Sequence, residues 1–530
     1  MPEITKNKII YDERDWLAGL HPQNGNRTIP QKFGKFSRYQ LSFNPFINFG
    51  YAQSGYLNSD VTKNSIITSR IVSKSDDSFV SPDDFFFALE ENGLIHYITN
   101  YNAAVDNDTF PHEITDVVRA FDICRYNVGA TDYYFYTHRA GSATVMDIGR
   151  YDGSITFDDD FMSTAPAIGA NAMSASAIFN PLIVGHDDIL YVGGGRYVGS
   201  YDGPNDTFNY RRLTLPAKLN VVAFVKYNPR TLAIFVQGGG TTTSSDGDCR
   251  VYFWDYLSDD PYDMKKIDDF EILSAFEYKG TIACITKGRD LMHKLMVFNG
   301  SIFQEIARLS SNYDSGRTIV GPSYKGVFVN NNEIWFNVAD SRNGYICCYG
   351  NNLGAENKLN VVAKNDVYVS ESEIYTPGII TIGKDNKVLF SSGSLFTDDH
   401  SKSSTQYLDT TKYSGATQWY SDLIDIGDER VRITGITIYF AKEFTGGRSI
   451  GLSLFDRYSG EYYIKGLVEL TTVTSTNRIY RVKPFNHTGD TFIPPLDGVG
   501  IKLYWFPGSG TTVTPTINKI VLDYEPVKIN

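Results

Sequence analysis

Short apolar stretches alternate with polar turn residues along most of the chain. Phe85–Leu89 and Leu94–Ile98 are two such stretches, and Asn92–Gly93 lies in the turn between them. Such stretches of apolar and aromatic residues are typical of β-strands, and an Asn-Gly turn between two of them predicts a hairpin. Similar pairs continue to about residue 405, and hardly any segment has the 3.6-residue period of an amphipathic helix. The pattern therefore predicts an all-β protein.

A longer unit recurs within this region. Three segments share a strand, then Asp-Gly or Asn-Gly, then a Phe a few residues later: Gly149–Phe161, Gly199–Leu213 and Met296–Leu309. We count about six or seven such units at spacings of roughly 40 to 55 residues, each with about four strands, which is typical of a β-propeller. Packing the sheets around an axis covers faces that a single sheet leaves exposed. Residues 56–405 are thus predicted to form a β-propeller of six or seven blades.

The glycine triplet Gly193–Gly195 has two interpretations. A phosphate-binding loop needs a helix N-terminus directly behind its glycines. Here the chain continues as Tyr197–Asp202, which has the aromatic and β-branched content of a strand. We therefore interpret the triplet as a hairpin turn or bulge between two strands.

The two ends of the chain differ from the middle. Residues 1–55 are rich in aromatic residues but have no sustained period, so we expect an irregular segment that docks on its own chain or on a neighbouring subunit. Residues 406–530 alternate cleanly, with a slip near Gly435 that suggests a bulge. About eight strands over roughly 120 residues predict a β-sandwich or jelly-roll domain there.

Charge and cysteine content narrow the classes of function. The chain has 49 Lys and Arg against 61 Asp and Glu, a net charge of −12, which argues against a protein that mainly grips nucleic-acid phosphates. An acidic wall remains compatible with a passage through which DNA slides. The cysteines are odd in number, match no zinc spacing and are expected to be reduced and buried: Cys124, Cys249, Cys284, Cys347 and Cys348. Because there is neither a secretory signal nor a long apolar stretch, we expect no membrane partner.

Candidate chemical groups are plentiful but scattered. Paired acidic residues in turn-like contexts are better explained by turn hydrogen bonds than by a bound cation or a hydrolase pair: Asp76–Asp77, Asp83–Asp84, Asp158–Asp160, Asp187–Asp188, Asp259–Asp260 and Asp398–Asp399. No two histidines have ligand spacing on one element: His21, His96, His112, His138, His186, His293, His400 and His487. Trp419–Tyr420 and Tyr504–Phe506 are expected in a core or subunit contact more than on a sugar. We predict no catalytic, cofactor-binding or metal-binding residue and no cofactor.

The arrangement of the whole chain resembles structural proteins of tailed-bacteriophage particles. The resemblance is carried by the irregular start (Asp15–Gln23, then Phe43–Tyr56), the propeller-like middle and the C-terminal segment Trp419–Gly460. It implies a non-enzymatic part of the virion tail or neck that assembles in a ring. It also implies partners among other virion proteins and copies of the same chain, with viral DNA passing unbound.

Two other classes of function stay open. One is a carbohydrate-binding or carbohydrate-cleaving propeller that recognises a host-surface glycan, which would need carboxylates converging at the mouth of the propeller. The other is a cellular protein-interaction scaffold, which would be a monomer with an ordered N-terminus. For the virion protein, we expect deletion of residues 1–50 to abolish assembly and leave the propeller folded.

Overall fold

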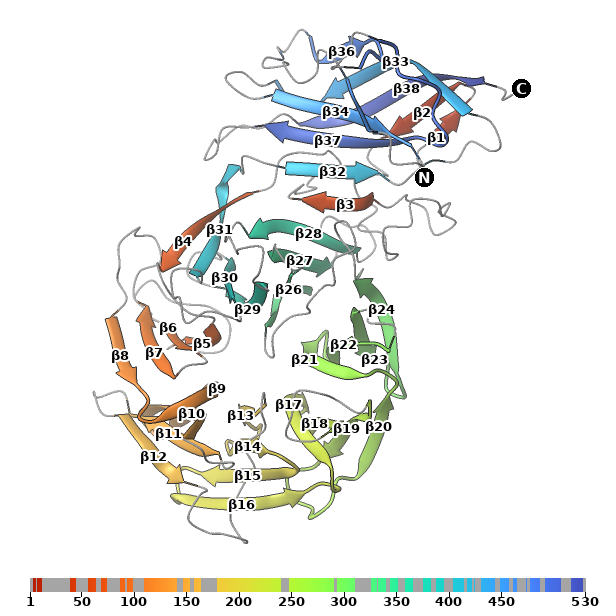
Figure 1. Cartoon of the computed structure of the whole chain (residues 1–530). Coiled ribbons are helices and arrows are strands. Elements are labelled where there is room, and N and C mark those ends of the chain that lie inside the picture. Colours follow the sequence, from red (N-terminus) through yellow and green to blue (C-terminus); the bar gives the residue numbers. More distant parts are fainter. Residues whose placement is uncertain are drawn as a thin grey trace.

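The computed structural model shows a chain built from strands (Figure 1). It describes residues 3–5, 7–11, 39–43, 56–62, 68–73, 86–90, 93–98, 109–140, 146–152, 157–163, 179–239, 247–289, 293–309, 326–330, 332–339, 344–350, 358–365, 375–382, 388–394, 404–413, 417–421, 424, 430–443, 449–456, 461–464, 473, 477–486, 491–506 and 516–527. Every regular element in these ranges is a β-strand. The predicted all-β class is confirmed.

Seven four-stranded antiparallel sheets account for the middle of the described chain. The first three are β5 (Thr68–Ser73), β6 (Phe86–Glu90), β7 (Leu94–Ile98) and β8 (Thr109–Glu113); β9 (Val117–Val128), β10 (Thr131–Ala140), β11 (Asp147–Tyr151) and β12 (Phe157–Ser163); and β13 (Leu182–Val184), β14 (Leu190–Gly194), β15 (Tyr197–Asp202) and β16 (Thr207–Thr214).

The next two sheets are β17 (Leu219–Asn228), β18 (Thr231–Gly238), β19 (Cys249–Trp254) and β20 (Asp263–Ile267); and β21 (Glu271–Tyr278), β22 (Thr281–Lys287), β23 (His293–Phe298) and β24 (Phe303–Leu309). The last two are β25 (Val327–Asn330), β26 (Glu333–Ala339), β27 (Gly344–Gly350) and β28 (Lys358–Asn365); and β29 (Tyr375–Ile382), β30 (Val388–Ser394), β31 (Ser404–Tyr413) and β4 (Tyr56–Thr62).

The first strands of these sheets contact one another in a closed cycle. The order of contact is β5, β9, β13, β17, β21, β25, β29 and again β5. Figure 1 shows the sheets standing around a common centre, which is the arrangement of a β-propeller. The sheet that closes the cycle takes β4 from near the N-terminus, which pairs with β31.

Apolar clusters lie between neighbouring sheets of the ring, as the alternation of the strands requires. One cluster joins Phe235 and Phe253 of one sheet with Ile272, Cys284 and Phe298 of the next. Three further clusters join other pairs of consecutive sheets in the same way. Burial of such side chains contributes about 1.5–3 kcal/mol each, so the ring is held together mainly by contacts between sheets.

The glycine triplet lies in a hairpin, as predicted. β14 ends at Gly194, Gly195 has a φ of +55° in the turn, and β15 begins at Tyr197. A Cβ on Gly193 would lie 2.7 Å from a methyl carbon of Val221 on the next sheet. Glycine is therefore needed at 195 for the turn and at 193 for close packing.

Two five-stranded sheets lie beside the ring, next to β28, and hold both ends of the chain (Figure 1). One contains β1 (Glu3–Thr5), β2 (Lys8–Tyr11), β38 (Ile517–Val527), β33 (Arg430–Phe440) and β36 (Ile479–Val482). The other contains β3 (Tyr39–Phe43), β32 (Thr417–Ser421), β37 (Gly500–Phe506), β34 (Ser449–Phe455) and β35 (Glu461–Tyr463). A shared core of Val, Ile, Leu and Tyr side chains lies across both sheets.

The expectation of an irregular segment over residues 1–55 is wrong for three stretches. β1, β2 and β3 are strands, and β2 pairs with β38 while β3 pairs with β32 of the same chain. Ile9 and Tyr11 are buried in the shared core because alternate residues of β2 face it. The expected boundary at 405 is displaced too, since β31 runs on to Tyr413. The bulge near Gly435 is present, as a register shift between Ile433 and Gly435.

All five cysteines are buried, as expected. Burial raises the pKa of the Cys284, Cys347 and Cys348 thiols well above the usual range, so these three are poor nucleophiles. Within the described ranges, no helix has both the length and the apolar character needed to span a bilayer.

Candidate interaction surface

The acidic run Asp158–Asp160 lies on β12, at the junction of two sheets. Asp159 accepts hydrogen bonds from the Tyr136 hydroxyl (2.5 Å) and the Thr115 amide (2.9 Å), and His112 Nε2 lies 2.6 Å from it. Burial alone would raise the pKa of Asp159, but these bonds hold it below the usual range. His112 is on β8, so this carboxylate ties two sheets of the ring together.

The pair Asp187–Asp188 lies in the turn between β13 and β14 and has turn roles. Asp187 accepts a hydrogen bond from the Tyr191 hydroxyl at 2.6 Å. Asp188 has a φ of +57°, and its backbone carbonyl accepts a hydrogen bond from the Tyr126 hydroxyl at 2.7 Å. Both residues thus contribute to the hydrogen bonds of this turn.

Several other acidic, histidine and aromatic candidates lie outside the part of the chain that the structure describes. Asp76, Asp77, Asp83, Asp84, Asp398, Asp399, His21, His400 and His487 lie outside the described residues, and so do the side chains of His96, Trp419, Tyr420, Trp505 and Phe506. Tyr504 is buried, and its ring stacks on that of Tyr463 at 5.7 Å. Within the described part, no three His, Cys, Asp or Glu side chains are grouped as a metal site requires.

His138 and His293 are buried, and His293 has a consequence for stability. Its Nδ1 has no hydrogen-bond partner, and burial, assisted by Lys287, lowers its pKa to about 4. Because an unfolded chain binds this proton near pH 6.5, stability is expected to fall as pH drops from 6.5 to 4, by about 1.4 kcal/mol per pH unit at most. Chemical denaturation at pH 7 and pH 4.5 checks this.

The substitution His293→Gln should flatten that part of the pH profile. His186→Gln is the matched control, because His186 is exposed. If the stability of the His293→Gln variant fell with pH as it does in the unmodified chain, His293 would not be the group responsible.

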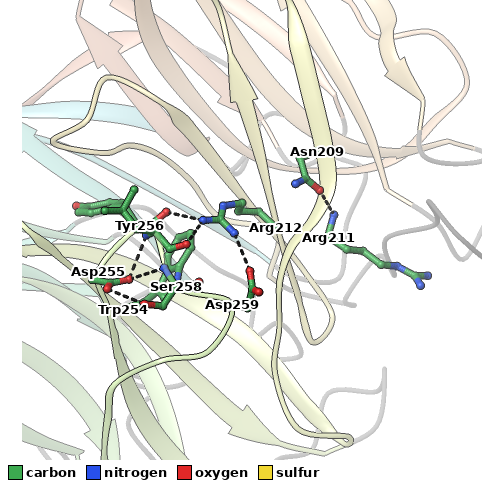
Figure 2. A network of polar contacts seen from close by, with 9 residues as sticks. Asn209, Arg211, Arg212, Trp254, Asp255, Tyr256, Ser258 and Asp259 are labelled. Carbon is green, nitrogen blue, oxygen red and sulfur yellow. Dashed lines mark hydrogen bonds and ion pairs between the residues drawn. The ribbon is translucent and has the colours of Figure 1, made fainter.

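A rigid turn projects from the sheet β17–β20. We call residues 254–259 the Leu257 turn (Figure 2). The Asp255 carboxylate accepts hydrogen bonds from the backbone amides of Leu257 (3.1 Å) and Ser258 (2.8 Å), and these bonds lower its pKa. Trp254 Nε1 donates to the Ser258 carbonyl at 2.7 Å. Tyr256, between them, has a φ of +68°, which is unusual for a bulky residue.

Arg212, on β16 of the neighbouring sheet, holds this turn from outside. Its guanidinium donates to the carbonyls of Tyr256 and Leu257 and lies 3.5 Å from a carboxylate oxygen of Asp259. Figure 2 shows Arg212 reaching toward the turn and Arg211 pointing away from it. A backbone with positive φ persists only where its surroundings fix it, and here five hydrogen bonds with three side chains do so.

The fixed turn exposes apolar side chains. Leu257 is 80% exposed, Tyr262 58% and Met264 41%, all on or just after the connection from β19 to β20. Ile302, in the corresponding β23–β24 connection of the next sheet, is 62% exposed. Two adjacent sheets thus expose large apolar side chains in corresponding connections.

A basic and aromatic patch lies at the other end of the sheet β13–β16. We call Arg196, Tyr197 and Arg211 the Arg196 patch. The guanidinium carbon of Arg211 lies 4.4 Å from the centre of the Tyr197 ring, and that of Arg196 lies 5.2 Å from it. Arg196 also donates to the Tyr197 hydroxyl at 3.3 Å. Stacked guanidinium groups on an aromatic ring form a flat cationic surface suited to carboxylates.

The sequence signals for these surfaces were available but weak. The sequence indicates Asp259–Asp260 only as an acidic pair, whereas the apolar residues inside Asp255–Met264 are the more unusual feature. Nothing near Arg212 in the sequence indicates that it reaches a turn 44 and 45 residues away.

No protein-family model matches the chain, and no curated protein matches it in sequence. Among solved structures, the chain is similar to the β-propeller domain of Cps50 (Swd1) from Myceliophteria thermophila, with 10% sequence identity and a TM-score of 0.40. The match covers 67% of this chain and 100% of that one.

Proposed function

We propose that this chain is a non-enzymatic structural protein that works by binding copies of itself and other proteins. The single observation that carries the proposal is the Leu257 turn, where a strained and heavily bonded backbone presents an apolar side chain to solvent. Strain of this kind is typical of functional sites, and an apolar tip suits a protein contact. Asp159 and Asp187, two of the acidic residues considered as candidate chemical groups, accept hydrogen bonds from tyrosine hydroxyls of the same chain.

The proposal includes a finer description of the fold. The seven four-stranded sheets are the seven blades of one propeller, closed by β4, and the two five-stranded sheets are a β-sandwich. The cyclic contacts and the shared core support this. Such a body is stiff, because each sheet is fixed by two neighbours, and stiffness suits a wall in an assembly.

In its narrowest form, the proposal is a part of the tail or neck of a tailed-virus particle, assembled in a ring. The support is the sequence resemblance in arrangement, together with a net charge of −12, which would let DNA pass without being held. A cellular scaffold would use similar surfaces but would stay a monomer.

Light scattering of the purified full-length chain over a range of concentrations tests the proposal. We expect masses that rise above the 59.4 kDa of one chain toward a defined multiple. A mass that stays at 59.4 kDa at every concentration would contradict self-assembly and favour the cellular scaffold.

A further inference from the structure

The Leu257 turn and the Arg196 patch lie at opposite ends of adjacent sheets. In an antiparallel sheet, successive connections alternate between the two ends of the strands. Gly195 and Arg196 connect the second and third strands of the sheet β13–β16, whereas residues 255–262 connect the third and fourth strands of the sheet β17–β20. The two surfaces therefore face opposite sides of the ring.

The two surfaces are complementary in charge. Residues 255–264 contain no Lys or Arg and four Asp, of which Asp255 is bonded within the turn and Asp263 pairs with Lys265. Asp259 and Asp260 are exposed, with the Asp259 side chain 99% accessible. The Arg196 patch holds two guanidinium groups and an aromatic ring, and its three residues are half-buried. The acidic surface around Leu257 thus has a surface of opposite charge, the Arg196 patch, on the other side of the same molecule.

On these grounds we infer that the Leu257 turn of one copy docks on the Arg196 patch of the next, in a head-to-tail contact. The inference rests on the proposed self-assembly and names the surfaces that make it. Head-to-tail contacts use two different patches and generate rings or filaments, not closed pairs. Leu257 and Tyr262 supply the apolar contact, and Asp259 and Asp260 face the arginines.

Arg212 is a positioning residue in this contact. It holds the backbone of the turn through two carbonyl groups and does not itself reach the other copy. Preorganisation of this kind lowers the entropy cost of binding. The contact is thus built on an element that is already fixed before the copies meet.

The test uses two full-length variants and their mixture. Leu257→Glu changes the exposed turn side and Arg196→Glu the half-buried patch side, and Leu257→Ser is a milder second substitution. We expect each variant alone to self-associate about 30-fold more weakly than the unmodified chain, as for a contact hot spot. An equimolar mixture should form pairs of twice 59.4 kDa and nothing larger, since one intact contact remains.

The outcomes separate this inference from the proposed function. Phe492→Glu is the matched control, because Phe492 is 65% exposed and lies between the five-stranded sheet strands β36 and β37. If the unmodified chain assembles and Leu257→Glu assembles equally well, the contact is wrong while self-assembly stands. If both variants are monomers and the mixture forms no pairs, the head-to-tail contact is also wrong. If the unmodified chain is a monomer, both proposals fail.

Discussion

Deleting residues 1–50 is expected to unfold the paired five-stranded sheets while the ring of four-stranded sheets stays folded. The deletion removes β1, β2 and β3 but keeps β4, which begins at Tyr56 and closes the ring. Ile9 and Tyr11, which are 0% and 1% exposed, leave the shared core. Loss of two such side chains costs roughly 5 kcal/mol or more, which is comparable to the whole stability of a domain.

Calorimetry distinguishes the two parts. The full chain should show two unfolding transitions and the truncated chain only one. Ile9→Ala with Tyr11→Ala should lower the transition of the five-stranded sheets, whereas the matched pair Lys8→Ala with Ile10→Ala should have little effect, because these residues face away from the core. Retention of both transitions in the truncated chain would contradict the assigned pairing. If the truncated chain fails to assemble, the failure would therefore reflect the unfolding of these sheets as well as the loss of any contact made by residues 1–50.

Replacing Asp269 by Ala is expected to destabilise the ring by roughly 3 kcal/mol, because it leaves the mostly buried Lys294 cation without its partner. Asp269 lies in the connection between β20 and β21 and is 3% exposed. Its carboxylate accepts hydrogen bonds from the Thr286 hydroxyl (2.5 Å) and the Lys294 ammonium group (2.6 Å). The carboxylate thereby fixes the passage of the chain from one sheet to the next.

The neighbouring residue supplies a matched control. Asp268 lies 3.5 Å from Lys266, but both side chains are mostly exposed, so Asp268→Ala should cost no more than about 1 kcal/mol. Denaturant unfolding at pH 7 measures both. The double change Asp269→Leu with Lys294→Met should recover much of the stability, since it removes both charges together. Equal losses of stability in the Asp269 and Asp268 variants would show that the Asp269–Lys294 pair contributes no more than the exposed Asp268–Lys266 pair.

Local sequence patterns predicted most strands, because each strand and the turn that follows it are formed by consecutive residues. Gly195 and Gly93, both with positive φ, mark two hairpin turns that were expected from the sequence. The strands β1 and β2 were missed because three and four residues are too few to show a period. The pairing of β4 with β31 was missed as well, since residues so distant in the sequence leave no local signal of their contact.

The candidate surface was less predictable than the fold. Acidic residues are common in turns, so the sequence could not distinguish Asp159, which joins two sheets, from Asp259, which is exposed beside Arg212. The backbone of Leu257 is held by Arg212, which comes from another sheet. Surfaces of this kind become visible only after packing has brought separate segments together.

The pairing of β2 with β38 determines how the chain responds to mechanical tension. Lys8 faces Asp523 and Tyr11 faces Ile520, so the two strands run in opposite directions. Once β1 has been drawn away, a pull on both ends of the chain would load the Lys8 end of this ladder first. The hydrogen-bonded pairs would then separate one after another at low force rather than resisting together. The ring lies outside this path of force until the hairpin has been peeled off, so the ends can yield while the ring keeps its shape.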